Sequence, residues 1–375
     1  MIRTTRRRRG VTLVEMMVAA ALCILGVWVL VWVYQQGLDS FRQGRATADL
    51  TAQERMVASL MTRDLKAPHF LEEDSKPNRG RRLSDQTKGL VDVPQTYKQP
   101  KSGYFWTKST TVGTIDDQGG VPDTNGGFFY PRSSQHFAQF TVILPGGTND
   151  QTFGVEVPSA LTLPNPPSTP TPYFGTAAEV SYFLVPSGKT PNGLVTVYDL
   201  YRRQRLVART TDDAPSYANA VAASNTDAPE VMAVNTTVNP RQMRTLAQLG
   251  VQANRLSPFS PLPVGSPRFG EDKLMSGILS LEIKYTGTGT TASGNTPGAT
   301  VWPTPFNPTT AYPQGNTDYP YDYIPMVGSN PGEFDTHGAN PGSLKQIRIT
   351  GAQIRIRAID LKTLTARSTT FTVDL

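Results

Sequence analysis

The chain has 375 residues, of which 38% are hydrophobic and 18% charged, so it is long enough to bury a large core. Its 32 glycines and 31 prolines favour strands and long loops, and they exclude an all-helical protein. The single cysteine, Cys23, excludes an internal disulfide. The three histidines, His69, His136 and His337, lack the spacing of zinc ligands, and we expect them to be surface or loop residues.

The net charge of +6 comes almost entirely from the first ten residues, which include five arginines. The rest of the chain contains 31 of the 36 basic residues and all 30 acidic residues, so its charges nearly cancel. A nearly neutral body gives no reason to expect a nucleic-acid binder.

A long apolar segment follows the arginines. Residues 16–34 are uncharged, and as a helix they would cover about 28 Å, close to the roughly 30 Å hydrocarbon thickness of a bilayer. The basic cluster predicts a cytoplasmic N-terminus, with the rest of the chain outside the inner membrane. The run is too long for a cleaved secretory signal, and the bulky Leu22 argues against a lipoprotein cysteine at Cys23. We therefore expect Cys23 to be a buried apolar residue of the membrane helix.

One carboxylate lies near the start of this segment. An unpaired Glu15 in lipid would cost roughly 2–3 kcal/mol, so it should be paired, protonated or functional. The order of a basic leader, Gly10, four mostly apolar residues, Glu15 and about twenty apolar residues resembles the signal of type IV prepilins. A plain signal anchor is the alternative.

The resemblance implies that a prepilin peptidase cuts between Gly10 and Val11 and methylates the new amine of Val11. It also implies that Glu15 pairs with such an amine on a neighbouring subunit, each charge relieving the desolvation of the other. Residues 1–10 would then be the cleaved leader and residues 11–34 the transmembrane helix.

The helix should continue through residues 35–67 and end at Pro68. Apolar residues recur at spacings near three, four and seven, and charged residues occupy other faces, so we expect the second half to pack on a sheet. The apolar positions are Leu38, Phe41, Ala48, Met56, Val57, Leu60, Met61 and Leu65, and the charged ones are Arg42, Arg45, Asp49, Glu54, Arg55 and Arg63. The helix end at residues 63–67 is similar to that of J-type minor pseudopilins and PilW-like minor pilins.

Residues 68–375 predict a β-rich head, so the fold class is α+β and pilin-like, with a long helix on an antiparallel sheet. We expect strands at residues 137–144, 180–185, 194–201 and 278–285, with short strands near 104–106 and 128–130. Residues 240–251 predict a short surface helix. Loop insertions are expected at about 72–135, 157–172 and 286–345, which are rich in Gly, Pro, Thr and Asn.

The C-terminus predicts a hairpin. Alternating isoleucines and arginines in residues 347–349 and 354–357 are out of phase across Gly351, which indicates a β-bulge. Phe371, Val373 and Leu375 predict the returning strand.

Three other motifs have simple structural interpretations. Residues 287–292 superficially match a dinucleotide fingerprint, but Gly294 and Pro297 preclude the following helix, so we expect a loop. Asp116, Asp117 and Asp123 are weak calcium candidates, for which a solvated turn is the simpler interpretation. Several arginines predict the solvated side of a sheet rather than a nucleic-acid surface: Arg202, Arg203, Arg205, Arg209, Arg348, Arg355 and Arg357.

The sequence therefore predicts a minor pseudopilin-like subunit of a type II secretion system, with a minor type IV pilin as the close alternative. Such a protein would be no enzyme and would need no cofactor, and its partners would be the prepilin peptidase, other pilins or pseudopilins, and inner-membrane lipid. A signal-anchored periplasmic binding module or enzyme is the alternative from another class.

Overall fold

The structure is a computed structural model. It describes residues 12–71, 80–86, 100–108, 136–146, 151–157, 171–191, 193, 196–210, 216–217, 233–235, 241–257, 270–291, 300–301, 326–327, 330–331, 333–337, 347–361, 363–364 and 366–375.

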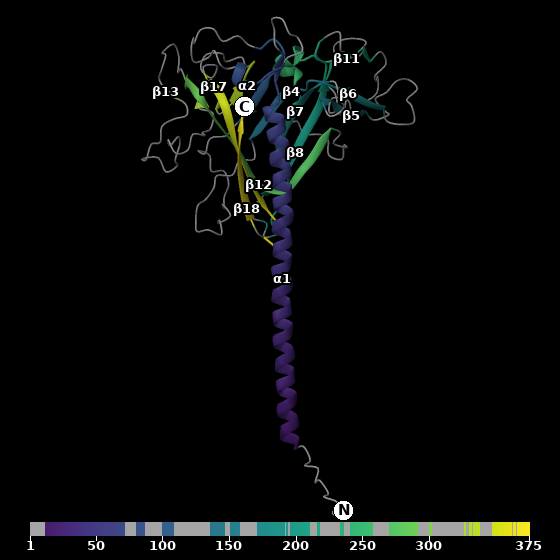
Figure 1. The fold of residues 1–375 in the computed structure, drawn as a ribbon, viewed down its shortest axis with the longest axis vertical. Coiled ribbons are helices and arrows are strands. Elements are labelled where there is room, and N and C mark those ends of the chain that lie inside the picture. Colours follow the sequence, from purple (N-terminus) through teal and green to yellow (C-terminus); the bar gives the residue numbers. More distant parts are fainter. Residues whose placement is uncertain are drawn as a thin grey trace, which may run out of the picture.

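A single long helix, α1 (Leu13–Lys66), forms a stalk that carries the head at its C-terminal end (Figure 1). Its 54 residues correspond to a length of about 81 Å. The helix ends at Ala67, whose extended backbone (φ −66°, ψ 157°) is the conformation that a following proline favours. The predicted continuous helix up to Pro68 is confirmed.

The head is built on one antiparallel sheet, which has nine strands in the described residues. Eight of them follow the order β16-β3-β4-β7-β8-β12-β17-β18, and β13 pairs with β12. Their bounds are β3 (Phe105–Lys108), β4 (Phe137–Ile143), β7 (Ala177–Lys189), β8 (Thr196–Val207), β12 (Glu271–Thr291), β13 (Thr300–Val301), β16 (Glu333–Asp335), β17 (Ile347–Ile359) and β18 (Ala366–Asp374). The predicted α+β class is confirmed, as are the strands expected from residues 104, 137, 180, 194 and 278 onward; residues 128–130 lie outside the described part.

Smaller elements surround this sheet. Two-stranded pairs are formed by β1 with β2, β5 with β6, and β14 with β15, and a three-stranded sheet has the order β10-β11-β9. Their bounds are β1 (Phe70–Leu71), β2 (Gly80–Arg81), β5 (Phe153–Val157), β6 (Thr171–Gly175), β9 (Ser216–Tyr217), β10 (Val234–Asn235), β11 (Arg241–Met243), β14 (Met326–Val327) and β15 (Asn330–Pro331). Short helices are α2 (Leu83–Gln86), η3 (Gln248–Gly250) and η4 (Gln252–Asn254).

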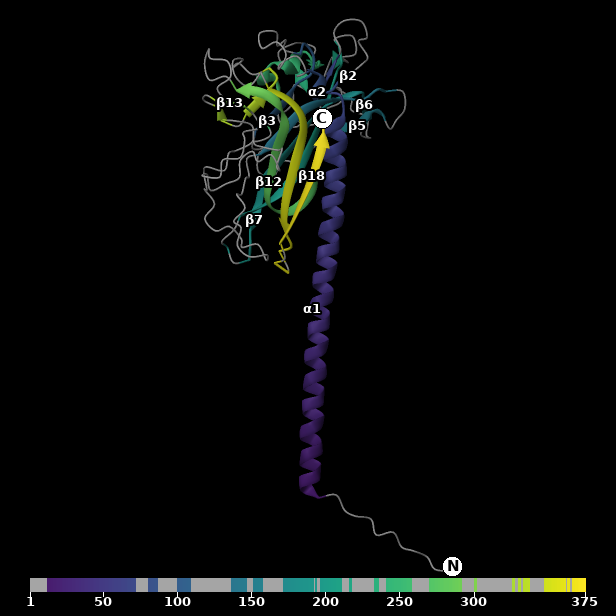
Figure 2. The ribbon, with the colours of Figure 1, turned by 60° about the vertical axis from the view of Figure 1, so that its left-hand side comes forward.

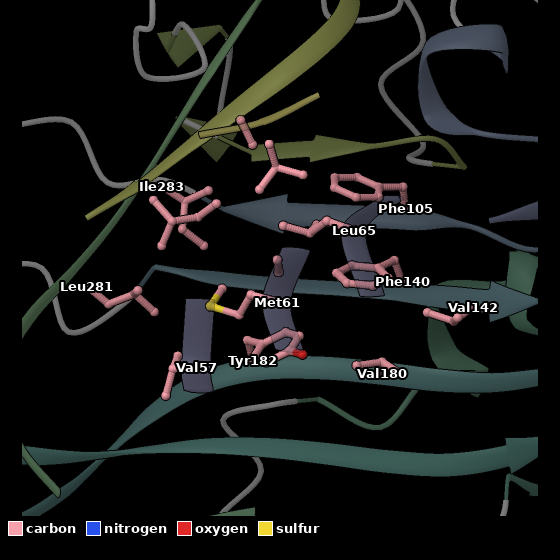
Figure 3. Close-up of a cluster of buried hydrophobic side chains, with 14 of the residues drawn as sticks. Val57, Met61, Leu65, Phe105, Phe140, Val142, Val180, Tyr182, Leu281 and Ile283 are labelled. Atoms are coloured by element: carbon pink, nitrogen blue, oxygen red, sulfur yellow. The ribbon is translucent and has the colours of Figure 1, made fainter. Parts of the chain in front are cut away.

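The main core lies between the last turns of α1 and one face of the sheet. Val57, Met61 and Leu65 point from the helix toward aromatic and aliphatic side chains of β3, β4, β7 and β12, among them Phe105 and Phe140 (Figure 3). All three helix residues are buried, which contributes roughly 1.5–3 kcal/mol for each side chain. Because these positions are four residues apart, one face of the helix carries the contact, as the apolar spacing predicts for Val57, Met61 and Leu65. The prediction is wrong for four other apolar positions, which are exposed because they lie on other faces of the helix or below the head: Leu38, Phe41, Ala48 and Met56.

The opposite face of the sheet is also covered. Tyr104, just before β3, and Ala177 and Val207, at the ends of β7 and β8, lie next to residues of the main core, and they pack with Leu246 and Leu249 of the segment 241–257. Side chains of the sheet also bind carbonyl oxygens of this segment, which closes the face. The short surface helix predicted at 240–251 is wrong, because the segment forms β11, a turn and η3, with Met243 and Leu246 buried.

The arginines of β8 are buried, so the predicted solvated basic face is wrong for them. Arg202 points to the face that α1 covers and pairs with Asp64. Arg203 and Arg205 point to the opposite face and pair with Glu271 and Glu179. Arg357 is buried as well, Arg209 donates to the Leu144 carbonyl oxygen, and Arg355 donates to Ser368. The side chain of Arg348 lies outside the described part.

The C-terminal hairpin is confirmed together with its bulge. Thr286 pairs with Gly351 and Gly287 pairs with Ile349, so Thr350 is the extra residue. The bulge places Ile349 on the same face as Ile354, and both are buried. Residues 287–291 are the end of β12, so the loop expected there is wrong. The expected insertions 72–135 and 286–345 also contain β3 and β16, which pair with each other in the main sheet.

Candidate processing and assembly segment

The N-terminus of α1 is closed by a reciprocal cap between Thr12 and Glu15. The Glu15 backbone N–H donates to Thr12 Oγ1 (3.3 Å), and the Thr12 backbone N–H donates to Glu15 Oε2 (2.9 Å). The Thr12 hydroxyl lies 3.1 Å from the same carboxylate oxygen. This capping box satisfies two donors that the first helical turn leaves open, and a negative charge there also complements the helix dipole.

Glu15 is exposed on the isolated chain, and the capping bonds reach only one of its two oxygens. The second oxygen leaves the carboxylate able to accept a further donor. Glu15 therefore has the position and the chemistry that the resemblance requires of a residue that pairs with a neighbouring amine. Gly10 and Val11 lie outside the described residues.

The apolar surface that follows Glu15 has no cover from the head. From Leu13 to Tyr34 every side chain is exposed, including Trp28 and Trp32 at 67% and 52% exposure. The helix is long and apolar enough to cross a membrane. Cys23 also lies on this exposed surface, so its predicted burial does not occur within the chain itself.

The upper end of the stalk is joined to the sheet by a buried carboxylate that the sequence did not single out. Asp64 Oδ2 accepts from Tyr182 Oη and from Arg202 Nε, both at 2.7 Å, and its other oxygen accepts from Arg63. Burial and the negative charge of Asp64 raise the pKa of Tyr182 well above its usual range, although Arg202 acts in the opposite direction. Tyr182 is therefore a neutral hydrogen-bond donor, and Asp64 and Arg202 form the ion pair that links α1 to β8.

A second buried carboxylate, Glu54, lies lower on the same helix. Its Oε2 accepts from Thr369 Oγ1 at 2.5 Å and lies 3.4 Å from Arg367 Nε, both on β18. Glu54 is 2% exposed, so its predicted place on a face away from the sheet is wrong. A charged residue three before Val57 and seven before Met61 is the one sequence signal that marks it as part of the buried stripe.

His69 follows the helix directly and is completely buried, which corrects the expected surface position. Its Nδ1 lies 2.7 Å from the Thr141 carbonyl oxygen, and its Nε2 lies 3.1 Å from that of Leu65. Burial lowers the pKa of His69 to about 4, although both carbonyl oxygens and Asp64 favour the cation. His69 is thus a neutral side chain at neutral pH that ties the end of α1 to β4.

The other two histidines are also structural. His136 is buried, and its Nδ1 accepts from the Ile283 backbone N–H, whereas His337 is half-buried with Nε2 2.6 Å from the Pro100 carbonyl oxygen. Among the residues that the structure describes, no three His, Cys, Asp or Glu side chains form a group that could hold a metal ion. The calcium candidates Asp116, Asp117 and Asp123 lie outside those residues.

Comparison with protein families finds the prokaryotic N-terminal methylation motif at residues 5–31. The match includes residues 5–10 of the basic leader, Val11, Glu15 and most of the uncovered apolar helix. Neither the comparison with curated proteins nor that with solved structures gives a match.

Proposed function

Since the chain carries the N-terminal signal of the type IV prepilin-like family, we propose that it is a minor pseudopilin-like subunit of a type II secretion system. In this proposal prepilin peptidase removes residues 1–10 and methylates the amine of Val11. The exposed apolar helix then leaves the bilayer for a filament, and the head stands on the extracytoplasmic side. The function is assembly rather than catalysis, and it requires no cofactor.

The observation that carries the proposal is the continuity of α1. The methylation motif lies at one end of this helix, and the head is packed on the other end without an intervening linker. About 37 residues between Leu13 and Asp49 are not buried by the head, which leaves a long surface for lipid or for neighbouring helices. A processing signal joined rigidly to a large β-rich head is what a filament subunit needs.

A minor type IV pilin is the second candidate, and the same motif and helix support it. The size of the head, with strands from residue 70 to residue 374, favours a minor over a major subunit in either machine. Identification of the filament with which the protein is purified distinguishes the two candidates.

The first experiment is the intact mass and N-terminal sequence of the protein isolated from native membranes. The expected product begins at N-methylated Val11 and lacks residues 1–10. Retention of the arginine leader in cells with active prepilin peptidase would instead make the protein a signal-anchored one.

The second experiment replaces the carboxylate. Glu15→Ala should remain in the membrane but lose incorporation into filaments, measured by cosedimentation with sheared filaments. Thr12→Ala is the matched control for loss of the helix cap alone, because it keeps the carboxylate. Incorporation of Glu15→Ala at the wild-type level would contradict the assembly mechanism.

A further inference from the structure

Two polar contacts join α1 to the head, at different positions along the helix and on different strands. Asp64 binds β7 and β8 near the C-terminal end of α1, and Glu54 binds β18 closer to the uncovered part of the helix. The ten residues between them correspond to about 15 Å along the helix. Figure 2 shows that the sheet is curved. Because β8 and β18 are separated by β12 and β17, the two contacts join α1 to different parts of this curved sheet.

The polar contacts add to what the apolar contacts specify. A shift of α1 by four residues would bring Leu50 to the place of Glu54, Leu60 to the place of Asp64, and the polar Gln53 to the place of the completely buried Val57. The places of Met61 and Leu65 would still receive apolar side chains, so the shift would disturb only part of the apolar packing. The buried Arg202 would also lose its carboxylate, which makes the shifted arrangement much less stable.

The contacts at the top act together as one anchor. Asp64 binds β7 and β8, and His69, five residues later, lies against the Thr141 carbonyl oxygen of β4. A polar anchor at one end of a rod constrains its tilt less than two polar anchors set apart along it, even where apolar side chains pack between them. Below it, Glu54 and Leu50 are the last buried residues before the uncovered stalk begins.

Glu54 contributes little to stability compared with its effect on geometry. It is almost completely buried, and its Oε1 has no hydrogen-bond partner among the residues that the structure describes. An unsatisfied buried carboxylate oxygen is costly, and a buried ion pair is often no more stable than an apolar replacement. The carboxylate makes a directional contact, because it accepts from Thr369 and pairs with Arg367 on β18. This contact constrains the position of α1 relative to that strand.

We infer that Glu54, with Arg367 and Thr369, is a positioning residue that sets the angle between the stalk and the head. The displacement caused by a change in this angle grows with distance along the stalk. Glu15 lies 39 residues, or about 58 Å, from Glu54, so a tilt of the stalk by about 10° would displace Glu15 by about 10 Å relative to the head. The inference concerns the geometry of the chain itself and does not depend on which filament the chain enters.

The test measures the stalk-to-head distance by double electron–electron resonance. Spin labels are placed on the stalk at Gln43→Cys and on the head at Val251→Cys, both exposed positions, in a Cys23→Ser background of the full chain in detergent. The wild-type background should give one narrow distance distribution. Glu54→Leu and Arg367→Leu should each broaden it at least twofold, and Arg367→Lys should restore most of the narrow distribution.

A matched control separates this effect from loss of charge on the helix. Asp39→Leu removes an exposed carboxylate that pairs with Arg42 on the uncovered stalk, and it should leave the distribution unchanged. If Glu54→Leu does not fold, the result for Arg367→Leu decides, because that arginine is 40% exposed and its replacement removes no side chain from the core. A distribution as narrow as wild type in the folded leucine variants would overturn the inference.

Discussion

The two halves of α1 are one continuous helix placed in two different surroundings. From Leu13 to Asp49 no side chain is buried by the head, whereas six of the following residues up to Leu65 are buried (Figures 1 and 3). The first half is apolar around its whole circumference for most of its length. The second half has a single apolar stripe that also contains two carboxylates.

This difference shows which interactions each half needs. A helix that is apolar all round finds its partners in a bilayer or among other helices, and the head offers none. The second half is folded as part of the head, so its carboxylates are neutralised by arginines from β8 and β18. Substitutions of the same residue type in the two halves should therefore have very different effects on the unfolding of the head.

The largest difference is expected between two aspartates. Asp64→Ala should lower the free energy of unfolding of the head by about 3–5 kcal/mol, because it leaves Arg202 buried without its carboxylate. Asp39→Ala should change it by at most about 0.5 kcal/mol, since the Asp39–Arg42 pair is exposed. Denaturant unfolding of the full chain in detergent, followed by tryptophan fluorescence, measures both; equal effects would contradict the division of the helix.

Two methionines give the corresponding comparison for apolar packing. Met61→Ala should cost about 2–5 kcal/mol, because the completely buried side chain leaves a cavity beneath Tyr182. Met17, 66% exposed on the stalk, should tolerate the same change within about 0.5 kcal/mol. A shift of the unfolding midpoint with Met17→Ala as large as that with Met61→Ala would mean that the stalk packs on the head.

A smaller and pH-dependent effect is expected at His69, where the helix meets the sheet. The folded pKa of about 4 lies below the ordinary value of 6.5, so between these values the unfolded chain binds a proton that the folded chain does not. The contribution of neutral His69 to the free energy of unfolding is fully present above pH 6.5. It falls by up to about 1.4 kcal/mol per pH unit as the pH drops toward 4.

His69→Gln removes this titration and should flatten the pH dependence in that range, apart from a constant loss of stability. The measurement is the denaturant midpoint of both proteins at pH 7.5, 6 and 5. Parallel pH profiles for the two proteins would show that another group is responsible.

Local patterns in the sequence predicted a large part of the fold. The apolar run and its following three-to-four spacing predicted the end of α1 to within one residue, because a helix needs only local hydrogen bonds and Pro68 ends it. Alternation predicted the main strands, and the phase change across Gly351 predicted the bulge that the register of β12 and β17 confirms. The position of Glu15 at the helix start also followed from the order of residues alone.

The polar interior was not predicted. Arg202, Arg203 and Arg205 suggest a solvated face when only their own strand is considered, and they are buried because carboxylates from α1, β12 and β7 meet them. Glu54 and His69 are likewise buried beside partners that are distant in the sequence, Arg367 and Thr369 for Glu54 and the Thr141 carbonyl oxygen for His69. Residues 287–291 were expected to be a loop, because glycine and threonine have no apolar periodicity, but pairing with β17 extends β12 through them.

The sequence by itself thus determined the methylation motif, a helix long and apolar enough to cross a membrane, and the continuity of that helix, since each depends on residues close together in the chain. Only the tertiary structure decided which charges are buried and how the stalk is held in the head. A buried charge is stable only beside its partner, and here the partners are up to 315 residues apart, as for Glu54 and Thr369. Periodicity along one segment carries no information about such a pair.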